Sequence, residues 1–268
     1  MPVRVPFYNR ITAEISAKGS SLCLGLDLDL RRESPLHGSS FSGLRDASLA
    51  IVDATADLVW GYKLNFAFFE QHGSRGLRWL EELRGAIGSR AVVIGDGKRG
   101  DIGSSAQRYA DALFGHLDLD AVTVSPYMGH DSIEPFADDP TRGAFILCLT
   151  SNPGSADFQQ QPPDDPLYLR VARWAAKHNS HGNLGLVVGA TRSGDMAAIR
   201  EAAPALPFLV PGIGSQGGNI EAAMSAHRPE APVIATVARS ILYHGAGTLE
   251  DIRRAVTEFN RMLDGARP

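Results

Sequence analysis

Three charged side chains able to transfer protons or stabilise charge lie within six residues, in the pattern D-x-K-x-x-D formed by Asp96, Lys98 and Asp101. The pattern follows an apolar segment, 91–94, that has the composition of a buried strand. Since side chains i and i+2 of a strand point to the same face, Asp96 and Lys98 are expected to share a face, with Asp101 just beyond the strand end. Buried carboxylates and ammonium groups are costly unless they pair. The pattern therefore predicts either a structural ion-pair cluster or a catalytic centre.

The elements that position this pattern are predicted from short apolar segments with helical patterns between them. Several of these segments are rich in Val, Ile and Leu, as strands buried on both faces are. The eight candidate strands are Leu22–Leu26, Leu58–Leu64, Val92–Ile94, Ala121–Val124, Phe145–Leu149, Leu184–Val188, Phe208–Val210 and Val233–Val237. Apolar residues have helical spacing over 77–83, 169–174 and 249–256, and an amphipathic stretch near Phe7–Ile15 precedes the first strand.

Strand–helix alternation repeated eight times over about 250 residues is typical of the (β/α)8 or TIM barrel. We therefore expect a single α/β barrel domain over residues 1–268, with an N-terminal helix before the first strand. The alternative is a doubly wound open sheet, but nothing after the first strand resembles the dinucleotide-binding pattern G-x-G-x-x-G. No sequence repeat, low-complexity tract or interdomain linker is apparent.

Composition narrows the classes of partner. The 268 residues are 44% hydrophobic with a formal net charge of −4, which gives no reason to expect nucleic acid or an anionic membrane as a partner. No segment approaches the ~20 uninterrupted apolar residues of a membrane span, and the first residues lack the apolar core of a signal peptide. Cys23 and Cys148 both lie inside predicted strands, which favours buried thiols over a disulfide or a catalytic cysteine. We expect a cytoplasmic protein.

Polar side chains follow nearly every predicted strand. Because active sites of barrels lie at the C-terminal ends of the strands, these groups are expected to meet at one rim. In chain order they are Asp27, Lys63 with Asn65, Asp96 with Lys98, Ser125, the segment 150–152, the segment 211–218 and Arg239. Charges from three neighbouring strands that converge at one rim are harder to explain as a single structural ion pair than as an active site.

The glycine-rich stretch after the seventh strand, 211–218, suits an anion. Gly212 and Gly214 let backbone N–H groups approach phosphate oxygens, and the N-terminus of a following helix adds a favourable dipole. Arg239, after the eighth strand, can supply charge-assisted hydrogen bonds. Loops after strands 7 and 8 are the usual phosphate site of this fold, so we expect phosphate binding there.

Two irregular segments and a histidine pair have more than one interpretation. The Pro-, Gly- and Gln-rich loop 152–166 is either a lid over the site or a surface insertion without a role, and the segment 29–42 has the same ambiguity. The glycine loop 212–218 is a second candidate lid. His178 and His181 lie close in sequence, but no carboxylate or cysteine has ligand spacing with them, so no metal site is expected.

The residues named above resemble the orotidine 5′-phosphate decarboxylases. The hallmark of that family is D-x-K-x-x-D at the end of the third barrel strand, with a lysine at the end of the second, here Lys63. The segment 63–70 is similar to the longer bacterial branch, type 2. That branch usually has proline after the lysine and threonine four residues beyond the second motif aspartate, where this chain has Leu64 and Ser105. Neither departure removes a charge, and the resemblance covers most of the chain.

The resemblance implies roles for the charged residues. Asp27 and Lys63 would hold ribose hydroxyls, and Asp96 would lie beside the substrate carboxylate. Lys98 would protonate C6 of the pyrimidine after CO2 leaves. Asp101 would come from the partner subunit of a homodimer with shared active sites.

The resemblance also implies roles for the uncharged and phosphate-binding residues. Ser105 would contact the ligand beside the partner's Asp101, and Ser151 would bond the pyrimidine ring. Gln216 and Arg239, together with the glycine loop, would bind the 5′-phosphate. The implied ligands are orotidine 5′-phosphate and UMP.

The implied reaction converts orotidine 5′-phosphate to UMP and CO2 in pyrimidine biosynthesis, without a metal or an organic cofactor. A fixed ammonium beside C6 stabilises the developing carbanion and supplies the proton. A rival is a magnesium-dependent sugar-phosphate lyase of the same barrel group, such as 3-keto-gulonate-phosphate decarboxylase or hexulose-phosphate synthase. Those enzymes share D-x-K-x-x-D but typically end strand 2 with a glutamate, whereas Lys63 would repel the metal. A non-catalytic sensor of phosphorylated ligands would need the phosphate site but not Lys98.

Overall fold

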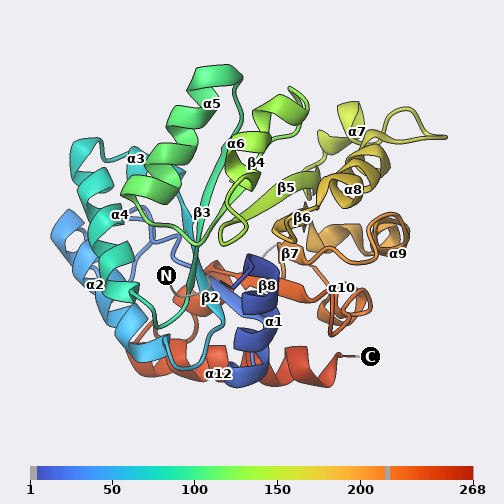
Figure 1. Cartoon of the computed structure of the whole chain (residues 1–268). Helices are drawn as coiled ribbons and strands as arrows, with labels where there is room; N and C mark the ends of the chain where they lie inside the picture. The colour runs from blue at the N-terminus through green and yellow to red at the C-terminus, as the bar shows by residue number, and fades with distance from the viewer. Residues whose placement is uncertain (1–4, 215–217, 268) are drawn as a thin grey trace.

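Eight parallel strands close into a barrel in the computed structural model, which describes residues 5–214 and 218–267. Each strand pairs with the next in sequence, and β8 pairs with β1, so the predicted (β/α)8 topology is confirmed (Figure 1). The strands are β1 (Leu22–Gly25), β2 (Gly61–Asn65), β3 (Val92–Arg99), β4 (Ala121–Val124), β5 (Gly143–Leu149), β6 (Leu184–Val188), β7 (Phe208–Pro211) and β8 (Val233–Val237).

Helices follow every strand and surround the barrel (Figure 1). The longer ones are α2 (Phe41–Thr55), α4 (Ser74–Ile87), α5 (Gly103–Ala110), α8 (Leu167–His178), α9 (Ser193–Ala202) and α12 (Leu249–Gly265). The shorter ones are α3 (Ala67–Glu70), α6 (Glu134–Ala137), α7 (Ser155–Phe158), α10 (Ile220–Met224) and α11 (Arg239–Leu242). A π-helical segment, Asp111–His116, continues α5, and 3₁₀ turns span His130–Ser132 and Ala190–Arg192. Within the described ranges, none of the helices combines the length and the apolar character needed to cross a membrane.

Local sequence explains where several helices begin. Ser40 precedes α2, and its hydroxyl accepts the N–H of Gly43. Thr248 and Asp251 form a reciprocal capping box at the start of α12. These caps satisfy backbone donors that would otherwise have no partner, so the polar residues between the apolar runs mark the helix starts.

The eight apolar runs coincide with the eight strands, although some ends differ. β2 begins at Gly61 rather than at Leu58, because 58–59 form the turn that follows α2. β3 continues past Ile94 to Arg99, so the first part of the D-x-K-x-x-D pattern lies inside the strand. Hydrophobicity alone therefore marked only the apolar half of β3.

The first helix, α1 (Phe7–Lys18), closes the N-terminal end of the barrel. Its apolar face packs against inward-pointing side chains of the strands; the cluster comprises Phe7, Ile11, Ile15, Cys23, Trp60, Val92, Ile94, Ala121, Phe145, Val187, Leu209 and Ile234. Gly143 allows this approach, since a Cβ there would lie 2.1 Å from the Phe7 ring. The predicted N-terminal helix is thus present, and it leaves the opposite end of the barrel for a site.

Inward-facing residues change from apolar to polar towards the C-terminal ends of the strands. On β3, Val92 and Ile94 belong to the interior cluster, and Asp96 follows them on the same face. On β8, Ile234 is followed by Thr236 in the same way. The outward-facing residues pack beneath the helices in a larger apolar cluster. The fold therefore presents polar side chains together at a single end of the barrel.

Candidate active site

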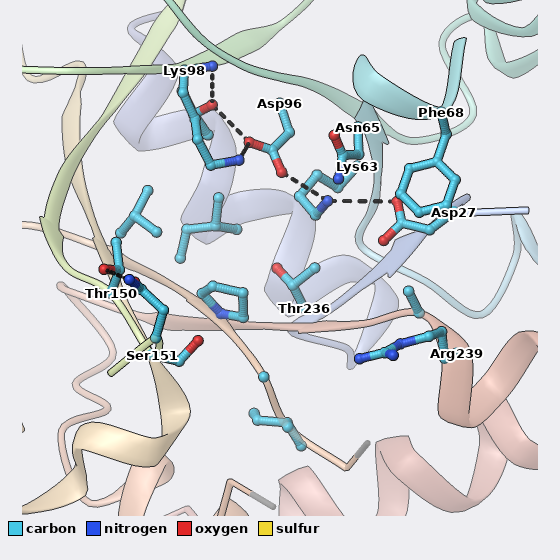
Figure 2. A pocket seen from close by; sticks show the side chains of 18 of the residues that line it. Asp27, Lys63, Asn65, Phe68, Asp96, Lys98, Thr150, Ser151, Thr236 and Arg239 are labelled. Atoms are coloured by element: carbon cyan, nitrogen blue, oxygen red, sulfur yellow. Dashed lines mark hydrogen bonds and ion pairs between the residues drawn. The ribbon is translucent and has the colours of Figure 1, made fainter. Parts of the chain in front are cut away.

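A cavity of about 700 Å³ opens at the C-terminal end of the barrel. This volume lies within the range of pockets that hold small organic ligands. Residues on or just after all eight strands line it, and Leu147, Val187 and Leu209 supply an apolar portion. Figure 2 shows charged side chains along one side of the cavity, with Ser151 and Arg239 apart from them.

Four charged side chains of alternating sign form a chain in the cavity (Figure 2). Lys63 Nζ lies 3.8 Å from Asp27 Oδ1 and 2.9 Å from Asp96 Oδ2. The other oxygen of Asp96, Oδ1, lies 2.6 Å from Lys98 Nζ. The side chains of Lys63 and Asp96 are 7% and 9% exposed, whereas that of Lys98 is 49% exposed. The buried pair therefore anchors an ammonium that faces the cavity.

The electrostatics keep both inner members of the chain charged. Burial opposes the ionised form of Asp96, but the charges of Lys63 and Lys98 outweigh it and hold the pKa of Asp96 well below its ordinary 3.8. Burial likewise opposes the ammonium of Lys63, but Asp27 and Asp96 raise its pKa above the ordinary 10.5. Each charge is therefore stabilised by its neighbours of opposite sign.

Replacing Lys63 with methionine is expected to lower the free energy of unfolding by about 3 kcal/mol at pH 7, because two carboxylates lose their shared buried partner. Since the pKa of Asp96 is lower in the folded protein than in the unfolded chain, its ionised form stabilises the wild type above about pH 4. This contribution is lost as pH falls through the folded pKa, so the deficit of the variant should shrink in acid. Urea unfolding, followed by circular dichroism at several pH values, measures this difference in unfolding free energy between the variant and the wild type.

The exposed Lys177→Met, on α8, is the matched control and should leave the unfolding free energy unchanged. A Lys63→Met deficit below about 0.5 kcal/mol at pH 7 would contradict the stabilising role of this ion pair.

The backbone of β3 bends at the residue that carries the exposed ammonium. Lys98 has φ +46°, a left-handed conformation that is uncommon for a residue with a side chain. The pairing register of β3 with β4 shifts between Gly95 and Arg99. Asp96 and Lys98 both line the cavity and contact each other, as expected, but the strand between them is irregular rather than simply alternating.

The predicted phosphate residues lie at the ends of β7 and β8. Gly212 and Arg239 line the cavity, whereas Gly214 does not. Gly212 has φ +98° and Gly214 has φ +82°, so both positions favour glycine. Arg239 is exposed, and no acidic side chain among residues 5–214 and 218–267 lies within ion-pair distance of it. Gln216 lies outside the described residues.

The loop 152–166 begins at the cavity. Ser151 and Asn152 line the cavity beside Thr150. Where the sequence indicated an irregular segment, the loop contains the short helix α7, and Gln159 Oε1 accepts the N–H of Thr150 at 2.8 Å. The other irregular segment, 29–42, also reaches the cavity, since Asp29, Arg31 and Arg32 line its mouth.

Asp101 and Ser105 do not line the cavity. Asp101 follows β3, and its Oδ1 accepts the N–H of Ile102 at 2.8 Å. Ser105 is exposed on α5. The fold therefore brings Asp27, Lys63, Asp96 and Lys98 together but does not place these two residues in the cavity.

Comparison with known proteins places this arrangement in a family. The family profile described as "Orotidine 5'-phosphate decarboxylase / HUMPS family" matches residues 20–255. The chain belongs to this family.

Individual relatives agree with the profile. The orotidine 5′-phosphate decarboxylase of Herpetosiphon aurantiacus is 46% identical over 245 residues, which cover 90% of this chain and 91% of that protein. The one from Thermomicrobium roseum is 45% identical over 246 residues, covering 90% and 88%. The solved structure of Leishmania donovani OMP decarboxylase has a TM-score of 0.85 and 36% identity, covering 98% of this chain and 99% of that chain.

Two hydroxyl groups in the site of this member of the decarboxylase/HUMPS family were not predicted. Thr123 and Thr236 both line the cavity, although the sequence reasoning assigned them no role. Each is the last residue but one of an otherwise apolar strand and faces inward. A lone hydroxyl at that position of a barrel strand is the signal that would have found them.

Neither the two cysteines nor the histidine pair lines the cavity. Cys23 and Cys148 are buried free thiols, as predicted, and burial raises the pKa of Cys23 to about 12. The His178 ring stacks on Trp174 at the end of α8. Over the part of the chain that the structure describes, no three His, Cys, Asp or Glu side chains are arranged to hold a metal ion.

Proposed function

We propose that this protein decarboxylates orotidine 5′-phosphate to UMP and CO2 by a metal-independent reaction of pyrimidine biosynthesis. One observation carries the proposal: in a member of the decarboxylase/HUMPS family, Asp27, Lys63, Asp96 and Lys98 form a chain of alternating charges in the barrel cavity. A cation already held by two carboxylates occupies the place where a magnesium-dependent member would need an acidic ligand. This arrangement of alternating charges therefore favours the metal-free chemistry.

The proposed chemistry centres on Lys98. The bond between C6 of the pyrimidine and its carboxylate breaks, CO2 leaves, and the electron pair stays on C6. The ammonium of Lys98 stabilises this developing charge and then transfers a proton to C6, after which solvent restores the ammonium. Asp96 orients the ammonium through its 2.6 Å contact, and Lys63 holds the other carboxylate oxygen of Asp96 in place. The chain of charges thus fixes the donor before the substrate arrives.

The rest of the cavity suits the remaining parts of the nucleotide. In the proposal, Asp27 and Lys63 bind ribose hydroxyls, and Ser151 binds the pyrimidine ring. Arg239 and the glycine loop that holds Gly212, Gly214 and Gln216 bind the 5′-phosphate. Support comes from the exposed guanidinium of Arg239 at the cavity wall and from the left-handed glycines beside it. Binding energy from a phosphate remote from C6 can be used to organise the reacting end.

The proposal also assigns Asp101 and Ser105 to the cavity of a second subunit in a homodimer. Both residues lie outside the cavity of their own subunit. Four large apolar side chains on α5 or on the segments that follow β3 and β4 are exposed to solvent; these are Ile102, Tyr109, Tyr127 and Met128. Exposed apolar groups of this size are typical of a surface that packs against a partner. They support a dimer whose interface lies at this rim.

Arg239→Ala is expected to lower kcat/KM for orotidine 5′-phosphate between about 10- and 100-fold, mainly through KM, because a charge-assisted hydrogen bond to phosphate is lost. The exposed Arg78→Ala, on α4, is the matched control for removal of a guanidinium and should have no effect. Steady-state kinetics with orotidine, which lacks the phosphate, tests whether the loss depends on the phosphate. The kcat/KM for orotidine should be the same in wild type and Arg239→Ala. An equal loss with both substrates would contradict the phosphate assignment.

The function itself is tested by following the ultraviolet absorbance of orotidine 5′-phosphate with the purified protein, with and without EDTA. We expect conversion to UMP at the same rate in both. Conversion that is lost in EDTA and restored by magnesium would contradict the metal-independent reaction. Binding of UMP without any turnover of orotidine 5′-phosphate would support a ligand sensor.

A further inference from the structure

The hydroxyl group of Thr123 on β4 forms hydrogen bonds with both Asp96 and Lys98 on β3. The Thr123 hydroxyl donates to Asp96 Oδ1 at 2.9 Å. The Thr123 hydroxyl oxygen in turn accepts the backbone N–H of Lys98 at 3.0 Å. Thr123 is 2% exposed and lines the cavity. One buried atom therefore contacts both the carboxylate and the main chain that positions the ammonium.

This contact lies where the local geometry is unusual. Lys98 has φ +46°, and β3 changes register against β4 between Gly95 and Arg99. A left-handed residue inside a strand persists only where surrounding contacts hold it. The bond from the Lys98 N–H to Thr123 is one such contact, and it comes from a neighbouring strand rather than from the turn itself.

The same hydroxyl also fixes the orientation of the Asp96 carboxylate. Oδ2 is held by Lys63, while Oδ1 receives both the Lys98 ammonium and the Thr123 hydroxyl. Both lysines are long side chains with several rotatable bonds, whereas Thr123 is short and β-branched on a paired strand. Thr123 is therefore the stiffest of the three partners of this carboxylate.

We propose that Thr123 is a positioning residue that sets the relative placement of Asp96 and Lys98 for proton transfer to C6. This inference rests on the proposed decarboxylase function. Thr123 does not transfer the proton; it holds the carboxylate and the strained main chain so that the ammonium points into the cavity. Misplacement of a reacting group by about 1 Å can cost ~10²-fold in rate, so loss of this hydroxyl should be visible in kcat.

The test compares Thr123→Val, which keeps the shape but removes the hydroxyl, with Thr123→Ser, which keeps the hydroxyl. We expect Thr123→Val to lower kcat between about 10- and 100-fold, with KM and the Kd of UMP within about threefold of wild type. Thr123→Ser should keep kcat within about threefold. Hydrogen exchange at the Lys98 amide should be faster in Thr123→Val and unchanged in Thr123→Ser, because only the first loses the acceptor. Thr123→Ala is the second hydroxyl-free variant should Thr123→Val fold poorly.

Three results would overturn the inference. They are a hydroxyl-free variant with wild-type kcat, a serine variant as slow as the valine variant, and a fall in UMP affinity as large as the fall in kcat. The last would indicate a general structural role. A wild-type protein inert towards orotidine 5′-phosphate would instead contradict the proposed function. In that case the exchange of the Lys98 amide still decides whether Thr123 holds the bend in β3.

Discussion

Lys98→Ala is expected to lower kcat for orotidine 5′-phosphate by at least about 10⁴-fold, while UMP binding remains measurable. In the proposed reaction, Lys98 is both the proton donor and the cation nearest to the developing carbanion, and each of these contributions is large in a preorganised site. The effect should fall on kcat because the proposal places the ammonium at C6 and assigns the phosphate and ribose contacts to other residues. Single-turnover absorbance measurements and calorimetric titration with UMP give the two quantities.

The structure provides a control that separates chemistry from folding in this experiment. Without Lys98, Asp96 keeps its 2.9 Å contact with Lys63, so the buried part of the charged chain remains paired. The variant should therefore fold, with a circular dichroism spectrum like that of the wild type. Lys177→Ala removes an exposed lysine from α8 and should leave kcat unchanged. Wild-type turnover by Lys98→Ala would show that the proton donor has been assigned wrongly.

The barrel could be predicted because its strands are buried on both faces. Val92–Ile94 and Leu184–Val188 are apolar without alternation, which is the pattern of parallel strands between a filled interior and an outer ring of helices. The continuation of β3 to Arg99 could not be predicted in this way, because Asp96 and Lys98 interrupt the apolar pattern. At the bend, the Lys98 N–H donates to the hydroxyl of Thr123, 25 residues later, and such a tertiary contact cannot be read from the local pattern.

The charged part of the candidate site could be predicted because a charge next to a buried strand needs a partner. That rule selected Asp27, Lys63, Asp96 and Lys98, and the structure brings these four together. It could not select Thr123, because threonine is common in strands and carries no charge. The same rule does not predict that Lys63 contacts both Asp27 and Asp96, because this contact follows from the stagger of neighbouring strands in the closed barrel.

The location of Asp101 also lies beyond what spacing can predict. Asp101 follows Lys98 by three residues, yet of the two only Lys98 lines the cavity. Asp101 lies between β3 and α5, where its Oδ1 accepts the N–H of Ile102. A linear motif thus divides into a part that lines the cavity and a part that does not, and this division supports the shared-site proposal.

A hybrid dimer that combines a Lys98→Ala subunit with an Asp101→Ala subunit is expected to regain about half of the wild-type activity per dimer. If each site takes Lys98 from one subunit and Asp101 from the other, the hybrid has one site with both lesions and one intact site. The parent homodimers should be nearly inactive, because every site in them lacks one of the two groups. Coexpression with two different affinity tags and sequential purification isolates the hybrid, and mass spectrometry verifies its composition.

A matched hybrid makes this test specific. Asp96 and Lys98 contact each other within one subunit, so a hybrid of Asp96→Ala and Lys98→Ala has one lesion in each site and should stay inactive. Recovery in the first hybrid but not in the second can arise only where Asp101 serves the neighbouring subunit. Absence of recovery in a verified Lys98→Ala/Asp101→Ala hybrid would restrict each site to one chain. Asp101, which does not line the cavity, would then reach it only through a movement of the segment after β3.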